Sequence, residues 1–363
     1  MNRSYRTVWN AALGACVAVA ENASAPRGRA RGSRRTARAG AVLAVAALAA
    51  GGVAQAATFT ASNEAQLATA IYQANASPDP TSTINLTTGI TITTALPQIQ
   101  GNVTVNTAAG GTSLGSLSGA AALNLQGGAA YGGPGVFRIG NSAGVTGTLT
   151  VQGAGTTLSA YSLSALGGQA NINLLDGGAI ALTLTSSGAQ LAGTAGGNFG
   201  GGSANVIVSG TGSKFIANVA QYVQQAGTLE VSKGGTVQAR STVFLGAQTG
   251  IFTGIVTGPG STLASVAQVI ALGAQGTATL TVADGGTISA GGGTTQVNLA
   301  GVNGTGTGSA TLNIGAAPGD AATAPGTVIA SAVHGGGGTA TLNFNHNASA
   351  YDFAVPITGN ANV

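Results

Sequence analysis

A short segment, Gly-Thr-Leu followed by one residue and Val, returns in variant form through residues 145–345. Each copy alternates apolar and polar residues with a period of two, which is typical of a half-buried β-strand. A Gly-rich turn follows most copies, and two further short strands complete the unit. The first strand recurs at 147–151, 227–231, 279–282, 311–314 and 341–344. Such a chain is restricted to architectures in which like units stack on one another.

The turns and the third strand give the length of this unit. Leu245, Leu272 and Leu299 mark the third strand and are equally spaced along the chain. The turn glycines follow one another at intervals in the low to mid twenties, apart from one longer interval: Gly155, Gly178, Gly212, Gly235, Gly260 and Gly286. Three short strands per period of this length indicate a solenoid whose successive rungs pair in parallel. We therefore predict an all-β fold, a parallel β-helix, over residues 106–345.

Two alternatives to a solenoid are a β-sandwich and an unfolded low-complexity tract. Near-copies at one fixed spacing are not expected in a sandwich, and regularly placed Leu, Val and Ile argue against an unfolded tract. The 62 glycines and the 6% of charged residues fit a solenoid, with glycines at the corners. The longer interval, between Gly178 and Gly212, contains a glycine-rich stretch at 196–202, which we expect to form a loop at one corner.

The alternation also predicts which side chains face inward. We expect Thr150, Glu230 and Thr281 to point to solvent, because each lies between two inward residues. The predicted inward residues are Leu149, Val151, Leu229, Val231, Leu280 and Val282.

Residues 57–105 are interpreted as a cap at the start of the solenoid. Apolar residues spaced i, i+3, i+4 and i+7 predict an amphipathic helix over 64–74, with Leu67, Ala70, Ile71 and Ala74 on its buried face. We expect Ser62 to be its N-cap, and Pro78 and Pro80 to end it. Short alternating strands are expected at 84–86, 90–92 and 103–105.

Residues 26–56 have the features of a secretory signal peptide. Residues 1–56 hold eight arginines and one glutamate, a net charge of +7, whereas residues 57–363 carry a net charge of −3. The apolar run 41–50 follows the basic stretch, and Ala54-Gln55-Ala56 is an A-x-A cleavage signal. We predict cleavage between Ala56 and Ala57. Because the basic residues are concentrated in this leader, the charge does not indicate a nucleic-acid binder.

Two alternatives for the leader are an uncleaved membrane anchor and a lipoprotein signal. The apolar run is too short to cross a bilayer core of ~30 Å. Gly51 and Gly52 also interrupt it. Residues 13–16 have the form of a lipobox ending at Cys16, but the apolar stretch before them is very short. Cys16 is the single cysteine of the chain, so a cleaved product would contain no disulfide.

Residues 1–25 resemble the extended signal peptide region of type V secretion proteins of Gram-negative bacteria. This resemblance implies export across the inner membrane by its secretion machinery, as an autotransporter or a related exoprotein. The matching positions are Met1, Asn2, Tyr5, Arg6, Val8, Trp9, Asn10, Leu13, Gly14, Val17, Val19, Glu21 and Ala23.

The repeats, in turn, resemble the right-handed parallel β-helix passengers of autotransporters, including their short passenger-associated transport repeats. Residues 58–105 are similar to the N-terminal cap of such passengers, and 342–353 to the stretch near their end. The resemblance implies a surface-exposed or secreted, non-enzymatic passenger that acts in adhesion or self-association. Its partners would be a host surface or like molecules.

An autotransporter passenger is followed by a β-barrel translocator in the outer membrane. Residues 346–363 are interpreted as the end of a passenger, and no run of membrane strands of ~10 residues follows. We therefore expect either a part of a longer protein or a two-partner exoprotein exported by another chain. The Asn-Pro-Asn-Leu and Asn-Pro-Asn-Gly motifs usual in two-partner exoproteins are missing, which favours the first alternative.

Few residues are candidates for chemistry, and we expect no enzymatic activity, cofactor or metal. Ser142 lies in a G-x-S-x-G pattern, but a strand is expected after it where a hydrolase has a helix. We expect His334 on a loop before four glycines, and His346 at a solvated turn. Asp176 and Asp284 precede Gly-Gly, where Asp suits a turn, and about four rungs separate them. A glycan-acting β-helix enzyme is the alternative, and it requires two carboxylates within ~10 Å.

Overall fold

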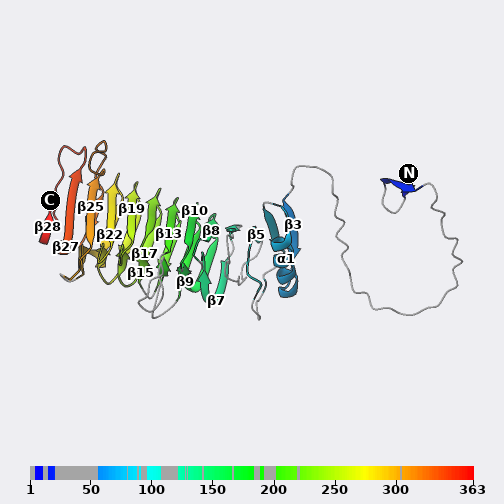
Figure 1. The fold of residues 1–363 in the computed structure, drawn as a ribbon. Coiled ribbons are helices and arrows are strands. Elements are labelled where there is room, and N and C mark those ends of the chain that lie inside the picture. Colours follow the sequence, from blue (N-terminus) through cyan, green and yellow to red (C-terminus); the bar gives the residue numbers. More distant parts are fainter. Residues whose placement is uncertain are drawn as a thin grey trace. The chain divides into compact units, whose positions relative to one another are not determined.

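The computed structural model describes two compact units, 1–51 and 52–363 (Figure 1). In the first unit, strands β1 (Tyr5–Asn10) and β2 (Ala15–Ala20) pair antiparallel as a hairpin. The described residues are 5–10, 15–20, 56–79, 81–87, 90, 96–107, 122–126, 128, 130–140, 143–165, 167–183, 189–191, 202–218, 221–302 and 305–363. The predicted loop at 196–202 lies almost wholly outside them.

The second unit is a parallel β-helix with three sheets, which we call faces A, B and C (Figure 1). On face A, twelve described strands pair in parallel, each with the strand of the next rung. They are β3 (Ala57–Ala61), β4 (Ser82–Leu86), β5 (Asn102–Thr107), β6 (Ala122–Gln126), β8 (Thr146–Gln152), β10 (Gln169–Leu175), β13 (Ser203–Ser209), β16 (Gly227–Ser232), β19 (Ile251–Thr257), β22 (Thr277–Ala283), β25 (Ser309–Gly315) and the second half of β27 (Ala332–Asn345).

Faces B and C are made of shorter strands. Face B contains the first parts of β7 (Ala130–Arg138) and β9 (Thr157–Ala165), followed by β11 (Ala179–Leu182), β14 (Lys214–Ala217), β17 (Thr236–Ala239), β20 (Thr262–Ser265), β23 (Thr287–Ala290) and β26 (Thr327–Ile329). Face C contains the second parts of β7 and β9, then β12 (Ala189–Leu191), β15 (Tyr222–Gln224), β18 (Val243–Leu245), β21 (Ile270–Leu272), β24 (Gln296–Leu299) and the first half of β27.

The pairing register confirms the predicted solenoid. Leu245 pairs with Leu272, and Leu272 pairs with Leu299, as their equal spacing indicates. All six predicted inward residues, from Leu149 to Val282, are at most 1% exposed and belong to one continuous core. The predicted outward residues Thr150, Glu230 and Thr281 are half-buried, because neighbouring rungs flank them at strand spacing. The right hand of the helix remains a prediction.

Six successive corners between faces A and B, from residue 153 to residue 286, alternate between two lengths. Three-residue corners at 176–178, 233–235 and 284–286 alternate with four-residue corners at 153–156, 210–213 and 258–261. In each three-residue corner the first residue is not glycine yet has a positive φ, of 52° at Asp176, 52° at Lys233 and 49° at Asp284. Asp tolerates this left-handed conformation better than most residues do, whereas Lys233 adopts it at a cost.

The two kinds of corner are linked from rung to rung. Each of these three four-residue corners ends in a buried Ser or Thr, whose hydroxyl accepts a hydrogen bond from a glycine N–H of the preceding rung. Ser213 Oγ accepts from Gly177 N, and Ser261 Oγ accepts from Gly234 N, both at 3.0 Å. Thr156 Oγ1 accepts from Gly128 N at 3.0 Å in the same way. Corner backbone that would otherwise be unpaired is thereby satisfied.

Helix α1 (Glu64–Ala76) lies between β3 and β4 in sequence and packs on both strands (Figure 1). The helix and its four inward residues agree with the prediction. The predicted cap was wrong by one residue, because Asn63, not Ser62, has the extended capping conformation and accepts from Gln66 N. Ser62 instead donates its N–H and hydroxyl to Gln66 Oε1. The chain therefore enters α1 through a reciprocal cap.

An aromatic cluster lies beside the last rungs. Phe344 occupies the inward register of Ile314, and Phe353 packs on it edge to face with ring centroids 5.1 Å apart. The Tyr351 hydroxyl donates to the carbonyl O of Gly326, and partial burial raises the pKa of Tyr351. Strand β28 (Ile357–Asn362) then continues the stack on β27.

Candidate binding face

The outer surface of face A is a ladder of small polar side chains. Thr228, Thr253, Thr279, Thr311 and Thr341 occupy the same position on five successive rungs. Face B carries a shorter ladder of the same kind, formed by Thr236, Thr262, Thr287 and Thr327. Each ladder repeats at the strand spacing of ~4.8 Å, because the strands are paired in register.

Hydrogen bonds between side chains connect the rungs along face A. Asn171 Nδ2 donates to Thr148 Oγ1 at 3.4 Å, and Asn205 Nδ2 donates to Asn171 Oδ1 at 3.1 Å. Thr228 Oγ1 then donates to Asn205 Oδ1 at 3.1 Å, which extends the series over four rungs. Near the other end, Asn343 donates to Asn313, and Asn313 to Thr281. Such bonds fix the side chains, so the outer surface of face A is ordered.

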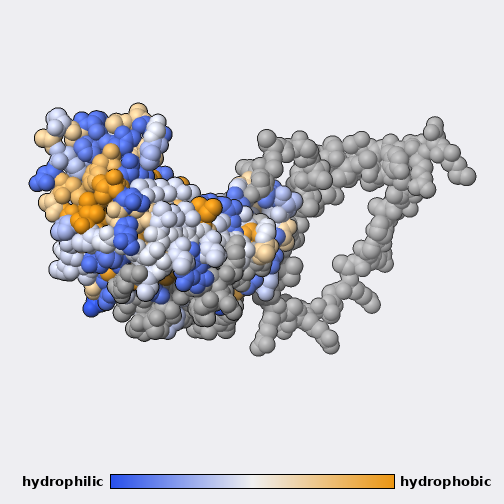
Figure 2. Space-filling view, turned by 60° about the vertical axis from the view of Figure 1, so that its left-hand side comes forward, coloured by the Kyte–Doolittle hydropathy of each residue, from blue (hydrophilic) through white to orange (hydrophobic). Residues whose placement is uncertain are grey.

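Face A carries almost no charge and a few apolar side chains. Among the outward positions of its described strands, Glu230 is the one ionisable residue, and it accepts a hydrogen bond from Ser232 Oγ at 2.8 Å. Ile251 is 71% exposed and Ile255 is 36% exposed on the same strand. On the side of the molecule that Figure 2 shows, hydrophilic and near-neutral colours predominate among the described residues, beside an orange, hydrophobic patch on the left of the view.

The carboxylates considered for glycan chemistry lie apart. Between Asp176 and Asp284 the register places the rungs of β13, β16 and β19. Four strand spacings, or about 19 Å, therefore separate the two corners. This distance agrees with the predicted separation and exceeds the ~10 Å of a hydrolase pair. Each Asp instead accepts a hydrogen bond from the preceding rung, Asp176 from Gln152 Nε2 and Asp284 from Thr257 Oγ1.

The structure corrects the predicted surroundings of both histidines. His334 lies within β27, not on a loop, and its Nδ1 is 3.0 Å from Thr358 Oγ1. The glycines after it continue the strand because their backbone passes close to neighbouring carbonyls, as Gly336 does at Ala300. His346 is half-buried, not freely solvated, and its ring centroid is 4.6 Å from that of Tyr351.

The remaining chemical candidates gain no support. Ser142 lies outside the described residues, and the element after it is strand β8, not a helix. The described part of the chain contains no group of three or more His, Cys, Asp or Glu residues placed to hold a metal ion.

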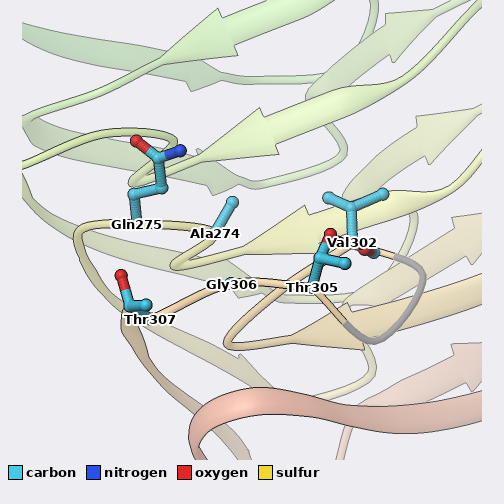
Figure 3. A pocket seen from close by; sticks show the side chains of 6 residues that line it. All are labelled: Ala274, Gln275, Val302, Thr305, Gly306 and Thr307. Atoms are coloured by element: carbon cyan, nitrogen blue, oxygen red, sulfur yellow. Dashed lines mark hydrogen bonds between the residues drawn. The ribbon is translucent and has the colours of Figure 1, made fainter.

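A pocket of about 360 Å³ lies between two corner loops after face C, with short neutral side chains and backbone around it (Figure 3). Gln275 and Ala274 come from one loop, and Val302, Thr305, Gly306 and Thr307 from the next. The described lining offers no titratable side chain that could act as a general base for the hydroxyls of Thr305 and Thr307.

The leader identifies the export route. Residues 1–51 match the family model of the extended signal peptide of the type V secretion system. The leader is that of a type V secreted protein. The match confirms the predicted resemblance and ends where the first compact unit ends. Among the described residues, no helix combines the length and apolar character that crossing a membrane requires.

A similar protein of known class supports the same interpretation. The chain is 35% identical over 133 residues to the adhesin BmaC autotransporter of Brucella suis biovar 1 (strain 1330). The aligned part is 33% of this chain and 4% of that protein, so the chain spans a small fraction of the relative it matches. No solved structure matches significantly. Leader and relative together indicate an autotransporter-type passenger exported to the cell surface or outer membrane of a Gram-negative bacterium.

The sequence predicts outward polar residues such as Thr150 and Thr281, but not how the members of the ladders bond. The signal was the alternation itself, which assigns Thr, Asn and Ser to outward positions on successive rungs. Which Asn donates to which Thr depends on how each side chain is oriented, and the alternation of apolar and polar residues does not specify that orientation.

Proposed function

We propose that this chain is a non-enzymatic adhesin passenger that binds through face A. The observation that carries the proposal is the pre-ordered, nearly uncharged ladder of Thr and Asn. Its twelve strands, at ~4.8 Å each and about six residues long at ~3.3 Å, give a flat surface of about 1,000 Å². This area exceeds the ~800 Å² that one partner of a stable protein complex buries. The relative's name, which calls it an adhesin, supports the same use.

The partners follow from this proposal. The leader would engage the inner-membrane secretion machinery, and an outer-membrane β-barrel translocator would carry the passenger outward. Outside the cell, face A would contact a host surface or another copy of the chain. A glycan-acting enzyme is the less supported function, because the register separates Asp176 from Asp284 by four rungs.

Charging face A is expected to abolish binding. In the triple variant Thr253→Lys, Thr279→Lys and Thr311→Lys, desolvating three like charges opposes contact with a neutral surface. We expect at least a tenfold loss in the retention of protein-coated beads on cultured cells and on a surface coated with the same protein. Flow-chamber counts measure both kinds of contact.

The ladder on face B supplies the matched control. The variant Thr236→Lys, Thr262→Lys and Thr287→Lys places the same three charges on three successive rungs of another face. It is expected to bind like the unmodified chain. Equal losses in the two variants, or no loss in the face A variant, would show that binding does not use face A.

We also propose that signal peptidase cleaves between Ala56 and Ala57. Ala57 is the first residue of β3, so cleavage there leaves every rung of the β-helix intact. Replacing Ala56 with Arg removes the small residue that the site requires, and we expect the exported protein to keep its leader. Gln55→Arg, at the tolerant position between the two alanines, is expected to be cleaved normally. Intact-mass measurement of the exported chain distinguishes these results, and cleavage of the Ala56→Arg protein at Ala57 would refute the site.

A further inference from the structure

A second pocket, of about 430 Å³, lies where helix α1 meets the strand region that follows it. Its volume falls within the roughly 300–1,000 Å³ typical of small-molecule sites. The described residues around it carry no charge: Tyr72, Asn75, Ala76, Pro97, Gln98 and Gln100. The pocket therefore combines one aromatic ring with amide side chains and lacks any described group that would attract an ion.

A polar clamp makes this pocket rigid. Asn75 Nδ2 donates to the carbonyl O of Gln98 at 2.7 Å, and Asn75 Oδ1 accepts from Gln100 N at 2.8 Å. Between these two contacts, Ile99 is fully buried in the core and anchors the segment. The backbone that carries Gln98 and Gln100 is thus tied to α1 on both sides of a core residue, so binding would have to order the side chains but not this backbone.

The exposed ring in the pocket is not needed for folding. Tyr72 is 66% exposed, while α1 packs on the β-helix through Leu67, Ala70, Ile71 and Ala74. Its hydroxyl has no hydrogen-bond partner among the described residues, and the exposed side-chain amides of Gln98 and Gln100 have none either. The ring and the two amides are therefore free to contact a ligand.

We propose that this pocket binds one hexopyranose residue of a neutral glycan. The negative face of the Tyr72 ring attracts the weakly positive C–H bonds on the apolar face of a pyranose. The Gln98 and Gln100 amides each present donors and an acceptor, which matches neighbouring hydroxyls that both donate and accept. A charged peptide would find no described counter-charge in the pocket, which favours the sugar.

The sugar site goes beyond the proposed role of face A, because its residues lie on α1 and on segment 97–100 and not on the ladder. Either proposal can therefore be refuted without refuting the other. Loss of sugar binding in a Tyr72 variant leaves contact through face A intact, and the lysine variants of face A leave the sugar site unchanged.

The test is a neutral glycan array probed with the purified, labelled full chain. We expect retention on a subset of hexopyranose-terminated glycans, and at least a tenfold loss of signal on those spots for Tyr72→Ala. Tyr72→Phe keeps the ring and is expected to retain binding within about threefold. The double variant Gln98→Ala, Gln100→Ala is expected to lose binding while keeping the ring.

Tyr161→Ala is the matched control, because Tyr161 is an exposed tyrosine, 43% accessible, on β9 of the same β-helix. We expect it to bind glycans normally. Circular dichroism melting curves of all variants should superpose, since every substituted side chain is exposed. Absence of any retained glycan, equal binding by Tyr72→Ala, or an equal loss in Tyr161→Ala would overturn the proposal. Binding of an uncharged peptide at Tyr72 without any sugar would overturn it as well.

Discussion

Replacing Gly235 with Ala is expected to destabilise the β-helix by about 3 kcal/mol or more, a large effect for one methyl group. Gly235 ends a three-residue corner, and a Cβ there would overlap the carbonyl O of Val208 on the preceding rung. The same overlap occurs at the equivalent glycines, between Gly178 and Val151 and between Gly286 and Val256. The missing side chain is therefore what lets successive rungs pair at strand spacing beside the corner.

We expect the rungs around Gly235 to lose stability first, because each rung of a solenoid contacts only its neighbours. Guanidinium unfolding of the full chain should show a lower midpoint for Gly235→Ala. Hydrogen exchange should become faster first in β13, β16 and β17, the strands around that corner. An exchange pattern changed equally in every rung would contradict this account.

Gly319→Ala is the matched control for the overlap. Gly319 has a positive φ of 87°, and a Cβ added there would have no atom within 4 Å. Gly235 is the opposite case: an added Cβ would overlap the preceding rung, but φ is not positive. An alanine at 319 meets only backbone strain, which costs about 1 kcal/mol. If both substitutions cost the same, conformation and not contact between rungs would explain the corner glycines.

The sequence predicted the fold because one pattern carries the inward residues and the turns together. Leu149, Leu229 and Leu280 alternate with polar residues and precede glycine turns at fixed offsets, so the intervals between turn glycines equal the register of face A. Two signals agree, which is why strands, core and parallel pairing were predictable. The helix at 64–74 was predictable for the same reason, from its period and its flanking prolines.

Features that depend on contact between rungs were not predictable. Strand β19 has Gly254 at the inward position where its neighbours have Leu229 and Leu280, so no repeat was recognised there. The Phe252 ring lies where a Cβ on Gly254 would be and fills that space from two residues away. Similarly, the glycines after His334 suggest a loop in the sequence, whereas in the structure Gly336 passes close to the carbonyl O of Ala300 on the neighbouring rung.

The two candidate sites also differ in whether the sequence could predict them. Outward Thr and Asn on face A follow from alternation, so the ladder was predictable in kind. The Tyr72 pocket was not, because the clamp of Asn75 on Gln98 and Gln100 joins positions that are 23 and 25 apart in the sequence. A single exposed tyrosine on a helix does not indicate a pocket unless the position of the neighbouring segment is known.

Tyr222 is one of the largest fully buried side chains, and its loss should destabilise the interior strongly. It is fully buried, packs on Phe215 edge to face with centroids 5.3 Å apart, and donates from its hydroxyl to Gln224 Oε1 at 2.7 Å. Gln224 Nε2 in turn donates to the carbonyl O atoms of Ala204 and Thr228. The network ties face C to face A through two successive rungs, and each of these polar atoms has a partner.

Tyr222→Ala is expected to destabilise the chain by about 3–5 kcal/mol, as the loss of a buried aromatic ring does elsewhere. Tyr222→Phe keeps the ring but leaves Gln224 Oε1 without its donor, and we expect a cost of about 1–3 kcal/mol. Guanidinium unfolding measures both values. Tyr161→Phe, at an exposed site, should cost almost nothing, and an equal loss there would show that the network adds no stability.

Unfolding measured at alkaline pH distinguishes the contribution of the Tyr222 hydroxyl to stability from that of its ring. Burial raises the pKa of Tyr222 above that of a free tyrosine, ~10, so above about pH 10 the unfolded chain releases this proton while the folded chain keeps it. Stability from Tyr222 is therefore complete below pH 10 and falls by about 1.4 kcal/mol per pH unit above it. The Tyr222→Phe chain should lose this part of the slope and, despite its lower stability at pH 8, approach the unmodified chain by pH 11. Parallel pH profiles of the two proteins would mean that the Tyr222 proton does not stay bound in the fold, and that the interior at this rung is open to water.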